Sequence, residues 1–172
     1  MTLVVIALLI FVPMLVEAAR ARRNERAQQA RGGIEPQGDV YSIMRAAYPA
    51  AFLAMLGEAA LRATRSTGST ALVIGVVVLA AAKLIKWSAI LALGRSWTFR
   101  VIVVPGDTLV ARGPYRYFRH PNYIGVIGEL VGAALLTGAR VTGPIAVIVF
   151  ALLLQKRIAV EERALRAAKM TQ

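Results

Sequence analysis

The sequence predicts an all-α integral membrane protein with about five transmembrane helices. Hydrophobic residues make up 58% of the 172 residues, whereas soluble domains contain about 45–50% apolar residues. The mean hydropathy is +0.61. The excess lies in several long apolar runs, and the arginines gather in the short connectors between them. Long apolar runs flanked by basic connectors are typical of helices that cross a bilayer.

The first two apolar runs differ in how clearly they predict a membrane span. Residues 2–19 are nearly uncharged, and five arginines follow them before the next glycine. Glycines and a proline then mark a loop. An arginine, a proline and a glutamate interrupt the second run, residues 41–61. This second helix therefore either crosses the bilayer or lies on its surface.

The third run, residues 71–93, is a clear span although it contains Lys83 and Lys86. Lysines in a span either extend their amines to the membrane surface or face a polar cavity, and we expect the first for at least one of them. Residues 94–122 are less apolar, and β-branched residues flank a Pro-Gly-Asp turn at 105–107. This pattern predicts a short hairpin or an extended loop over the membrane surface.

The fourth and fifth runs predict a helical hairpin. The fourth, residues 123–138, places Gly128 and Gly132 one turn apart, which allows close helix contact within one chain or between two. The oligomeric state therefore stays open. The fifth run, residues 144–160, begins after a Gly-Pro turn. The charged segment 155–170 is expected to form an amphipathic helix that extends out of the bilayer.

Glu129 lies inside the fourth run. A carboxylate within the membrane is expensive and often functional. It is a candidate polar contact of a functional site, or a member of a buried pair with Arg45, Lys83 or Lys86.

The connectors predict the orientation of the chain. Five spans place residues 20–40, residues 94–122 and the C-terminal segment on one side, and these segments carry most of the arginines. The opposite side holds Arg62, Arg65 and Arg140. Basic connectors stay in the cytoplasm. We therefore expect the N-terminus outside and the C-terminus, with the more basic connectors, in the cytoplasm.

Composition excludes several kinds of site. The chain has no cysteine and one histidine, which excludes thiol chemistry and metal sites built from thiolates or several histidines. No metal is expected, and no glycine-rich dinucleotide motif occurs. The net charge of +12 would indicate nucleic-acid binding in a soluble protein. Here the charge follows the membrane connectors, so no nucleic-acid partner is expected.

The single histidine lies in YRYFRHPNYIG, residues 115–125. Pro121 restricts the backbone of His120 and favours the first turn of a helix, so the imidazole is held just before the fourth run. Tyrosines supply flat faces and hydroxyls. Tyrosine and arginine here also fit an ordinary membrane-interface belt. That alternative does not explain why the histidine, the proline and Tyr123 fall together.

A second polar segment, RIAVEERAL at residues 157–165, lies at the cytoplasmic end of the fifth run. Arg157 and Glu161 are four residues apart and share a helix face at the depth where the fourth run begins. An ordinary ion pair at this spacing is the simpler account, and it suffices for Glu162 with Arg166.

GPYRYFRHPNYIG followed by RIAVEERAL resembles the isoprenylcysteine carboxyl methyltransferases and their bacterial relatives. This resemblance implies a polytopic enzyme that binds S-adenosylmethionine without a Rossmann fold. The resemblance covers roughly residues 75–172, and it is hydropathy that predicts three N-terminal membrane helices in residues 1–93. Residues 94–172 would form the catalytic region, with a short cytoplasmic hairpin or loop, a helical hairpin and a C-terminal helix that completes the cofactor pocket.

The resemblance also implies roles for individual residues. The segment that wraps the cofactor corresponds to Gly113, Tyr115, Arg119, His120, Pro121, Tyr123 and Gly125, and the family's paired acids correspond to Glu161 and Glu162. Arg157, with Glu161, corresponds to the place where the acceptor meets the methyl group. A sulfonium needs acidic or aromatic neighbours, and an anionic acceptor needs a cation. A hydroxyl acceptor would need a base, which is His120, Glu161 or Glu162.

The expected acceptor is an amphiphile whose tail enters from the bilayer, and the expected product is S-adenosylhomocysteine. A prenylcysteine carboxylate and a hydroxyl of a lipid-like polyketide, such as an alkylpyrone or alkylresorcinol, both agree with the resemblance. The chain is similar to bacterial members, so we expect it to lie in a bacterial inner membrane. Two alternatives are an NADPH-dependent enzyme of the sterol-reductase type and a non-catalytic membrane scaffold.

Overall fold

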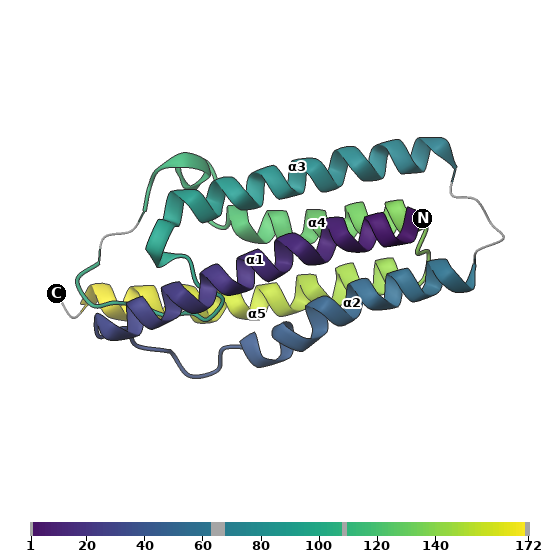
Figure 1. Ribbon diagram of the computed structural model, residues 1–172. Helices are drawn as coiled ribbons and strands as arrows, with labels where there is room; N and C mark the ends of the chain where they lie inside the picture. The colour runs from purple at the N-terminus through teal and green to yellow at the C-terminus, as the bar shows by residue number, and fades with distance from the viewer. Residues whose placement is uncertain (1, 63–67, 108–109, 171–172) are drawn as a thin grey trace.

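The computed structural model describes residues 2–62, 68–107 and 110–170, and these form an antiparallel bundle of five α-helices (Figure 1). The helices are α1 (Thr2–Ala30), α2 (Tyr41–Leu61), α3 (Ser69–Leu93), α4 (Pro121–Thr137) and α5 (Thr142–Met170). The α3–α4 connection contains two 3₁₀ turns, η1 (Gly94–Ser96) and η2 (Gly113–Arg116). The all-α prediction is confirmed for the described residues.

Three helices, α1, α3 and α5, are long and apolar enough to cross a membrane. Helix α4 is apolar but shorter, and α2 does not reach the same hydropathy. Large apolar side chains cover the outer faces of the three long helices; examples are Leu8, Val12, Val77, Leu84, Ile148 and Leu152. Such continuous apolar surface indicates contact with lipid. The chain is therefore an integral membrane protein, and the count of five spans stays a prediction.

The connections gather at the two ends of the bundle as the predicted topology requires. Figure 1 shows the α1–α2 and α3–α4 connections and the C-terminus at one end, and the N-terminus with the α4–α5 connection at the other. The basic segments 20–40 and 94–122 therefore share one end. Arg65, predicted for the opposite end, lies outside the described residues. Which end faces the cytoplasm stays a prediction.

Glycines of α4 bring this helix into close contact with α3. A Cβ atom added to Gly132 would lie 2.7 Å from the backbone nitrogen of Leu79, and one added to Gly128 would lie 2.7 Å from Cβ of Ala82. Real Cβ atoms do not approach other atoms so closely. The predicted role of Gly128 and Gly132 in helix contact is confirmed, and the partner is a helix of the same chain.

Both lysines of α3 point into the bundle, where they form a buried charge cluster with Glu17 of α1, Tyr48 of α2 and Glu129 of α4. Nζ of Lys86 lies 2.7 Å from a Glu17 carboxylate oxygen and 3.2 Å from one of Glu129. Nζ of Lys83 lies 3.1 Å from Glu129, and the Tyr48 hydroxyl donates to Glu129 at 2.6 Å.

The expectation that at least one lysine extends to the membrane surface is therefore wrong. Lys86 is 3% exposed, and Glu17 and Glu129 are 1% and 2% exposed. Carboxylates from two neighbouring helices meet the lysines at the same depth, and a buried charge is tolerated when it is paired. The alternative that Glu129 pairs with Lys83 or Lys86 is confirmed.

The described part of the α3–α4 connection is an extended loop. Val103 forms an isolated antiparallel bridge with Ile34 of the α1–α2 connection, with N–H···O distances of 2.9 and 3.0 Å. The Pro-Gly-Asp turn forms, closed by the Asp107 N–H to the Val104 carbonyl. Within the described part of this loop no strand pairs across that turn. Val103 pairs with a different segment, and residues 108 and 109, where the second strand of a hairpin would begin, lie outside the described residues, so the hairpin alternative stays open.

Polar side chains in the last turns of α1 fasten this loop. Asn24 donates to the carbonyls of Gly94 and Trp97. The Glu25 carboxylate accepts the N–H groups of Phe99 and Arg100, each at 3.2 Å. Together they give the loop a defined backbone path across the end of the bundle.

Helix α5 begins two residues before the predicted proline. Gly138 ends α4 in the left-handed region, with φ 64°. The Glu58 carboxylate of α2 then accepts the N–H groups of Val141 and Thr142 and the Thr142 hydroxyl. This carboxylate satisfies free donors at the start of α5. The helix continues without interruption to Met170, so the amphipathic tail is part of α5.

Candidate active site

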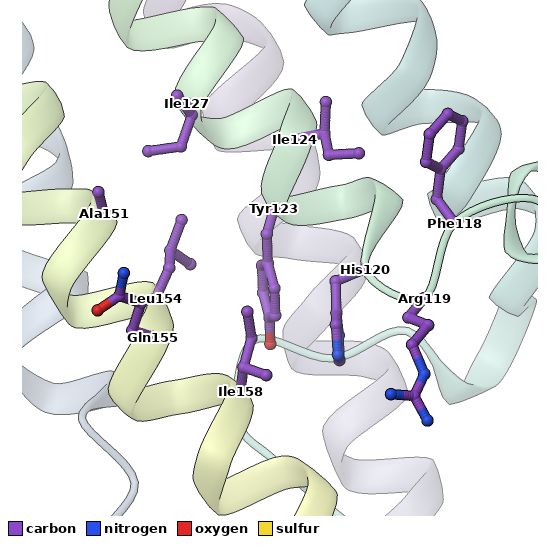
Figure 2. A pocket seen from close by; sticks show the side chains of 10 residues that line it. All are labelled: Phe118, Arg119, His120, Tyr123, Ile124, Ile127, Ala151, Leu154, Gln155 and Ile158. Carbon is purple, nitrogen blue, oxygen red and sulfur yellow. The ribbon is translucent and has the colours of Figure 1, made fainter.

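The site begins where the α3–α4 loop enters α4. His120 precedes the helix with φ −131° and ψ 60°, and Pro121 is the first helical residue, as the sequence predicts. The Tyr123 ring stacks on the imidazole, with ring centroids 5.4 Å apart and planes inclined by 14°. Figure 2 shows the two rings side by side and pointing in the same direction.

The paired acids of α5 lie against these rings. The Tyr123 hydroxyl donates to Oε2 of Glu161 at 2.7 Å. Nδ1 of His120 is 3.9 Å from Glu161, and Nε2 is 3.6 Å from Glu162. Nε2 is buried and has no hydrogen-bond partner among the described residues. The fold therefore brings the histidine motif and the acid pair together, with the imidazole between two carboxylates.

Arg119 adds an accessible positive charge beside the acids. Its side chain is 85% exposed, and Nη1 lies 3.6 Å from the Glu162 carboxylate. Glu162 also forms the predicted ion pair with Arg166, at 3.5 Å. Both pairs are substantially exposed and contribute little to stability, so Arg119 is free to contact a ligand.

Arg157 is buried, and all three of its guanidinium nitrogens have partners within the protein. Nε donates to the Tyr123 hydroxyl at 3.0 Å, Nη1 donates to Asp39 at 3.0 Å, and Nη2 donates to the carbonyl of Phe99. Arg157 and Glu161 therefore both contact the Tyr123 hydroxyl. The guanidinium is held between helices, away from the surface of the pocket described below.

Of the remaining predicted site residues, Tyr115 and Gly113 lie in η2, and Gly125 lies on a different face of α4. Tyr115, in η2, is partly buried, and this burial together with the nearby Glu161 carboxylate raises its pKa, so its hydroxyl stays protonated. Gly113 begins η2 with φ 60°, and a Cβ there would lie 3.1 Å from Ala92. Gly125 lies apart from the His120 group, on the face of α4 that contacts Lys86 of α3.

A pocket opens between α4 and α5 beside His120 (Figure 2). Its volume is about 450 Å³, within the range of small-molecule sites. The lining residues are Phe118, Arg119, His120, Tyr123, Ile124, Ile127, Ala151, Leu154, Gln155 and Ile158. The pocket is polar at the His120 end and apolar along the helices. A larger hollow of about 940 Å³ at the opposite end of the bundle includes none of the predicted site residues.

Sequence reasoning missed two polar residues that support the site. Asp39 ion-pairs with Arg157 from the α1–α2 connection. Asn122, inside the histidine motif, accepts from the Trp97 indole at 3.4 Å. Asp39 lies in a loop rich in glycine, where an aspartate is ordinary, so no local signal identified it. For Asn122, its position between Pro121 and Tyr123 in the histidine motif was a signal that it belongs to the site.

Comparison with known proteins identifies the family. A model described as the isoprenylcysteine carboxyl methyltransferase (ICMT) family matches residues 73–167, which include the His120 motif and both acids. Uncharacterized protein YpbQ of Bacillus subtilis (strain 168) is 36% identical over 161 residues, 94% of each chain. An uncharacterized protein of Haemophilus influenzae is 30% identical over 144 residues, 83% of each chain. No solved structure matches. The chain thus belongs to the isoprenylcysteine carboxyl methyltransferase family of membrane methyltransferases.

Proposed function

We propose that this protein transfers a methyl group from S-adenosylmethionine to an oxygen of an amphiphilic, lipid-like acceptor, leaving S-adenosylhomocysteine. The observation that carries this proposal is the placement of Glu161 and Glu162 within 4 Å of the imidazole at the polar end of an apolar pocket. A sulfonium cation is stabilised by carboxylates and by aromatic faces. The cofactor needs charged and polar partners, which the His120 end of the pocket supplies. The tail of the acceptor needs an apolar surface, which the rest of the pocket supplies.

The residues at the polar end fit the cofactor. Glu161, Glu162 and the Tyr123 ring suit the sulfonium, and Arg119 is exposed to receive a carboxylate. Tyr115 remains a hydroxyl donor. Gly113 and Pro121 shape the approach of the loop to α4. We propose that Gly125 acts indirectly, by letting α4 approach α3 closely.

The apolar part of the pocket fits the tail of the acceptor. Ile127 of α4 lies on the side of Ala151 and Leu154 of α5, whereas Ile124 lies nearer Phe118 (Figure 2). Burial of an alkyl chain contributes about 0.8 kcal/mol for each CH₂ group. An acceptor held in this way presents its head group to His120, and the site is then one for molecules that partition into the bilayer.

The polar groups favour a hydroxyl acceptor over a carboxylate. Arg157, the buried cation, is committed to Asp39, Tyr123 and Phe99. A carboxylate acceptor would instead approach two carboxylates, Glu161 and Glu162. A hydroxyl needs a base, and Nε2 of His120 is buried beside the pocket without a hydrogen-bond partner in the described residues.

In the proposed reaction the acceptor oxygen attacks the methyl carbon, and the carbon–sulfur bond breaks with its electron pair on sulfur. The hydroxyl proton passes to Nε2 of His120. The imidazolium then lies between Glu161 and Glu162, at 3.9 and 3.6 Å, and both carboxylates stabilise its charge. The enzyme's main contribution is alignment of the two reactants.

A carboxylate acceptor of the isoprenylcysteine type is the second candidate, and one observation favours it. The exposed Arg119 guanidinium lines the pocket and can pair with an anionic head group. Such an acceptor is already a nucleophile at neutral pH and would not require His120 as a base.

The test uses labelled S-adenosylmethionine and the protein purified in detergent. Two acceptors carry the same alkyl chain, one ending in a phenolic hydroxyl and the other in a carboxylate. We expect transfer to the hydroxyl, and we expect His120→Gln to lower its rate by about 10²–10⁴-fold. Tyr117→Phe is the control, because Tyr117 belongs to the same motif but is 76% exposed. Methylation of the carboxylate alone, unaffected by His120→Gln, would overturn the hydroxyl assignment.

A further inference from the structure

We propose that Asp39 is a positioning residue of this site: it holds the Arg157 guanidinium so that the Glu161 carboxylate stays turned toward Tyr123 and His120. This inference rests on the proposed function. Asp39 lies in the connection between α1 and α2, outside the family match at residues 73–167. The N-terminal half of the chain would then contribute directly to the geometry of the site.

The ion pair between Asp39 and Arg157 is buried and well fixed. The two side chains are 14% and 7% exposed, with Nη1 to Oδ1 at 3.0 Å. Backbone N–H groups of Tyr41 and Val101 donate to the same carboxylate, at 3.2 and 3.1 Å. A carboxylate held by two backbone donors has little freedom to move, so it defines the position of the guanidinium.

Arg157 has a competing partner on its own helix. Glu161 lies one turn further along α5, the spacing at which an arginine and a glutamate commonly pair. In this structure Arg157 instead reaches Asp39 and the Phe99 carbonyl. The Phe99 carbonyl is itself in place because Glu25 holds the adjoining N–H groups. The N-terminal half therefore supplies the partners that draw Arg157 away from Glu161.

A continuous set of contacts leads from Asp39 to the reacting end of the pocket. Arg157 donates to the Tyr123 hydroxyl, and this hydroxyl donates its proton to Glu161. The Tyr123 hydroxyl thus accepts a hydrogen bond from Arg157 and donates one to Glu161. This order leaves the Glu161 carboxylate oriented toward the ring of His120, 3.9 Å away.

Loss of the Asp39 charge should change the partner of Arg157. Asp39→Asn keeps the size of the side chain but leaves the guanidinium without its counter-ion. Arg157 can then pair with Glu161, which lies one turn away on the same helix. This pairing would turn the Glu161 carboxylate away from the pocket. We expect S-adenosylmethionine, whose sulfonium Glu161 is proposed to face, to bind at least about tenfold more weakly, as for the loss of a hydrogen bond to a charged group.

The experiment measures the Kd of S-adenosylmethionine, without an acceptor present, and the thermal unfolding of the wild-type protein, D39N, D39E and the double variant D39N/R157Q. Glu35→Gln is the matched control, because Glu35 lies in the same connection and makes an exposed pair with Arg100. We expect normal binding in E35Q, a tenfold or greater loss in D39N, and better binding in D39E than in D39N. In D39N/R157Q the competing cation is absent, so part of the lost affinity should return.

Normal affinity in D39N would overturn the proposal. So would weaker binding in D39N/R157Q than in D39N, because damage that adds up indicates a purely structural role. If D39N does not fold, the charge-balanced double variant decides: retained binding supports the proposal, and absent binding in folded protein contradicts it. Failure of the wild-type protein to bind is a separate result, and it would remove the proposed function itself.

Discussion

The Tyr123 hydroxyl donates to the Glu161 carboxylate at 2.7 Å, which joins the start of α4 to the cytoplasmic-facing part of α5 in the predicted topology. The same hydroxyl accepts from Arg157. One oxygen atom therefore links the histidine motif, the acid pair and the buried arginine.

Tyr123→Phe should weaken S-adenosylmethionine binding by about tenfold or more. The variant keeps the ring that stacks on His120 but removes the acceptor of Arg157 and the donor to Glu161, both charged partners. Calorimetric titration measures the loss. Tyr117→Phe removes an exposed hydroxyl from the same motif and should bind normally; equal affinity in both variants would contradict this role of Tyr123.

Glu129→Gln should destabilise the protein by about 3–5 kcal/mol, since it leaves one buried lysine without a full counter-charge. The midpoint of unfolding in detergent reports this change. A charge-balanced double variant, E129Q/K83M, should lose less. The exposed pair of Glu35 and Arg100 provides the comparison, because E35Q should cost less than about 1 kcal/mol. If E129Q and E35Q lower the free energy of unfolding by similar amounts, the buried charge cluster contributes no more to stability than the exposed pair.

Gly132→Ala should destabilise the bundle by about 1–3 kcal/mol, as overpacking in a tight interface does. The added Cβ would meet the backbone of Leu79 at 2.7–2.8 Å, and backbone atoms cannot rotate away. Gly57→Ala is the matched control. It lies in helix α2 with nothing within 4 Å, and alanine there should be neutral or stabilising by about 0.5–1 kcal/mol. A Gly132→Ala variant as stable as Gly57→Ala would refute the tight contact.

The parts of the fold that sequence reasoning predicted are those that depend on local pattern. Hydropathy predicted five helices and their approximate limits, and Pro121 predicted the start of α4. Gly128 and Gly132 predicted a close helix contact. Each of these signals lies within a few residues of the structure it specifies, so it can be read without knowing which helices are neighbours.

The parts that were wrong or missed depend on which helix faces meet. At least one of Lys83 and Lys86 was predicted to reach the membrane surface, and this was wrong. Their partner Glu17 lies in a different apolar run, and the sequence does not say how close the two runs are in space. Asp39 and Arg157 are separated by 118 positions. Their contact joins the α1–α2 connection to helix α5, and no periodic pattern encodes it.

The most direct test of the account is calorimetric titration of the folded, detergent-purified protein with S-adenosylhomocysteine, with NADPH as a separate ligand. We predict saturable binding of S-adenosylhomocysteine that is lost or strongly weakened in His120→Ala and Glu161→Ala, and no binding of NADPH. Absence of S-adenosylhomocysteine binding to folded wild-type protein would contradict the account. Binding of NADPH in its place would indicate a membrane reductase.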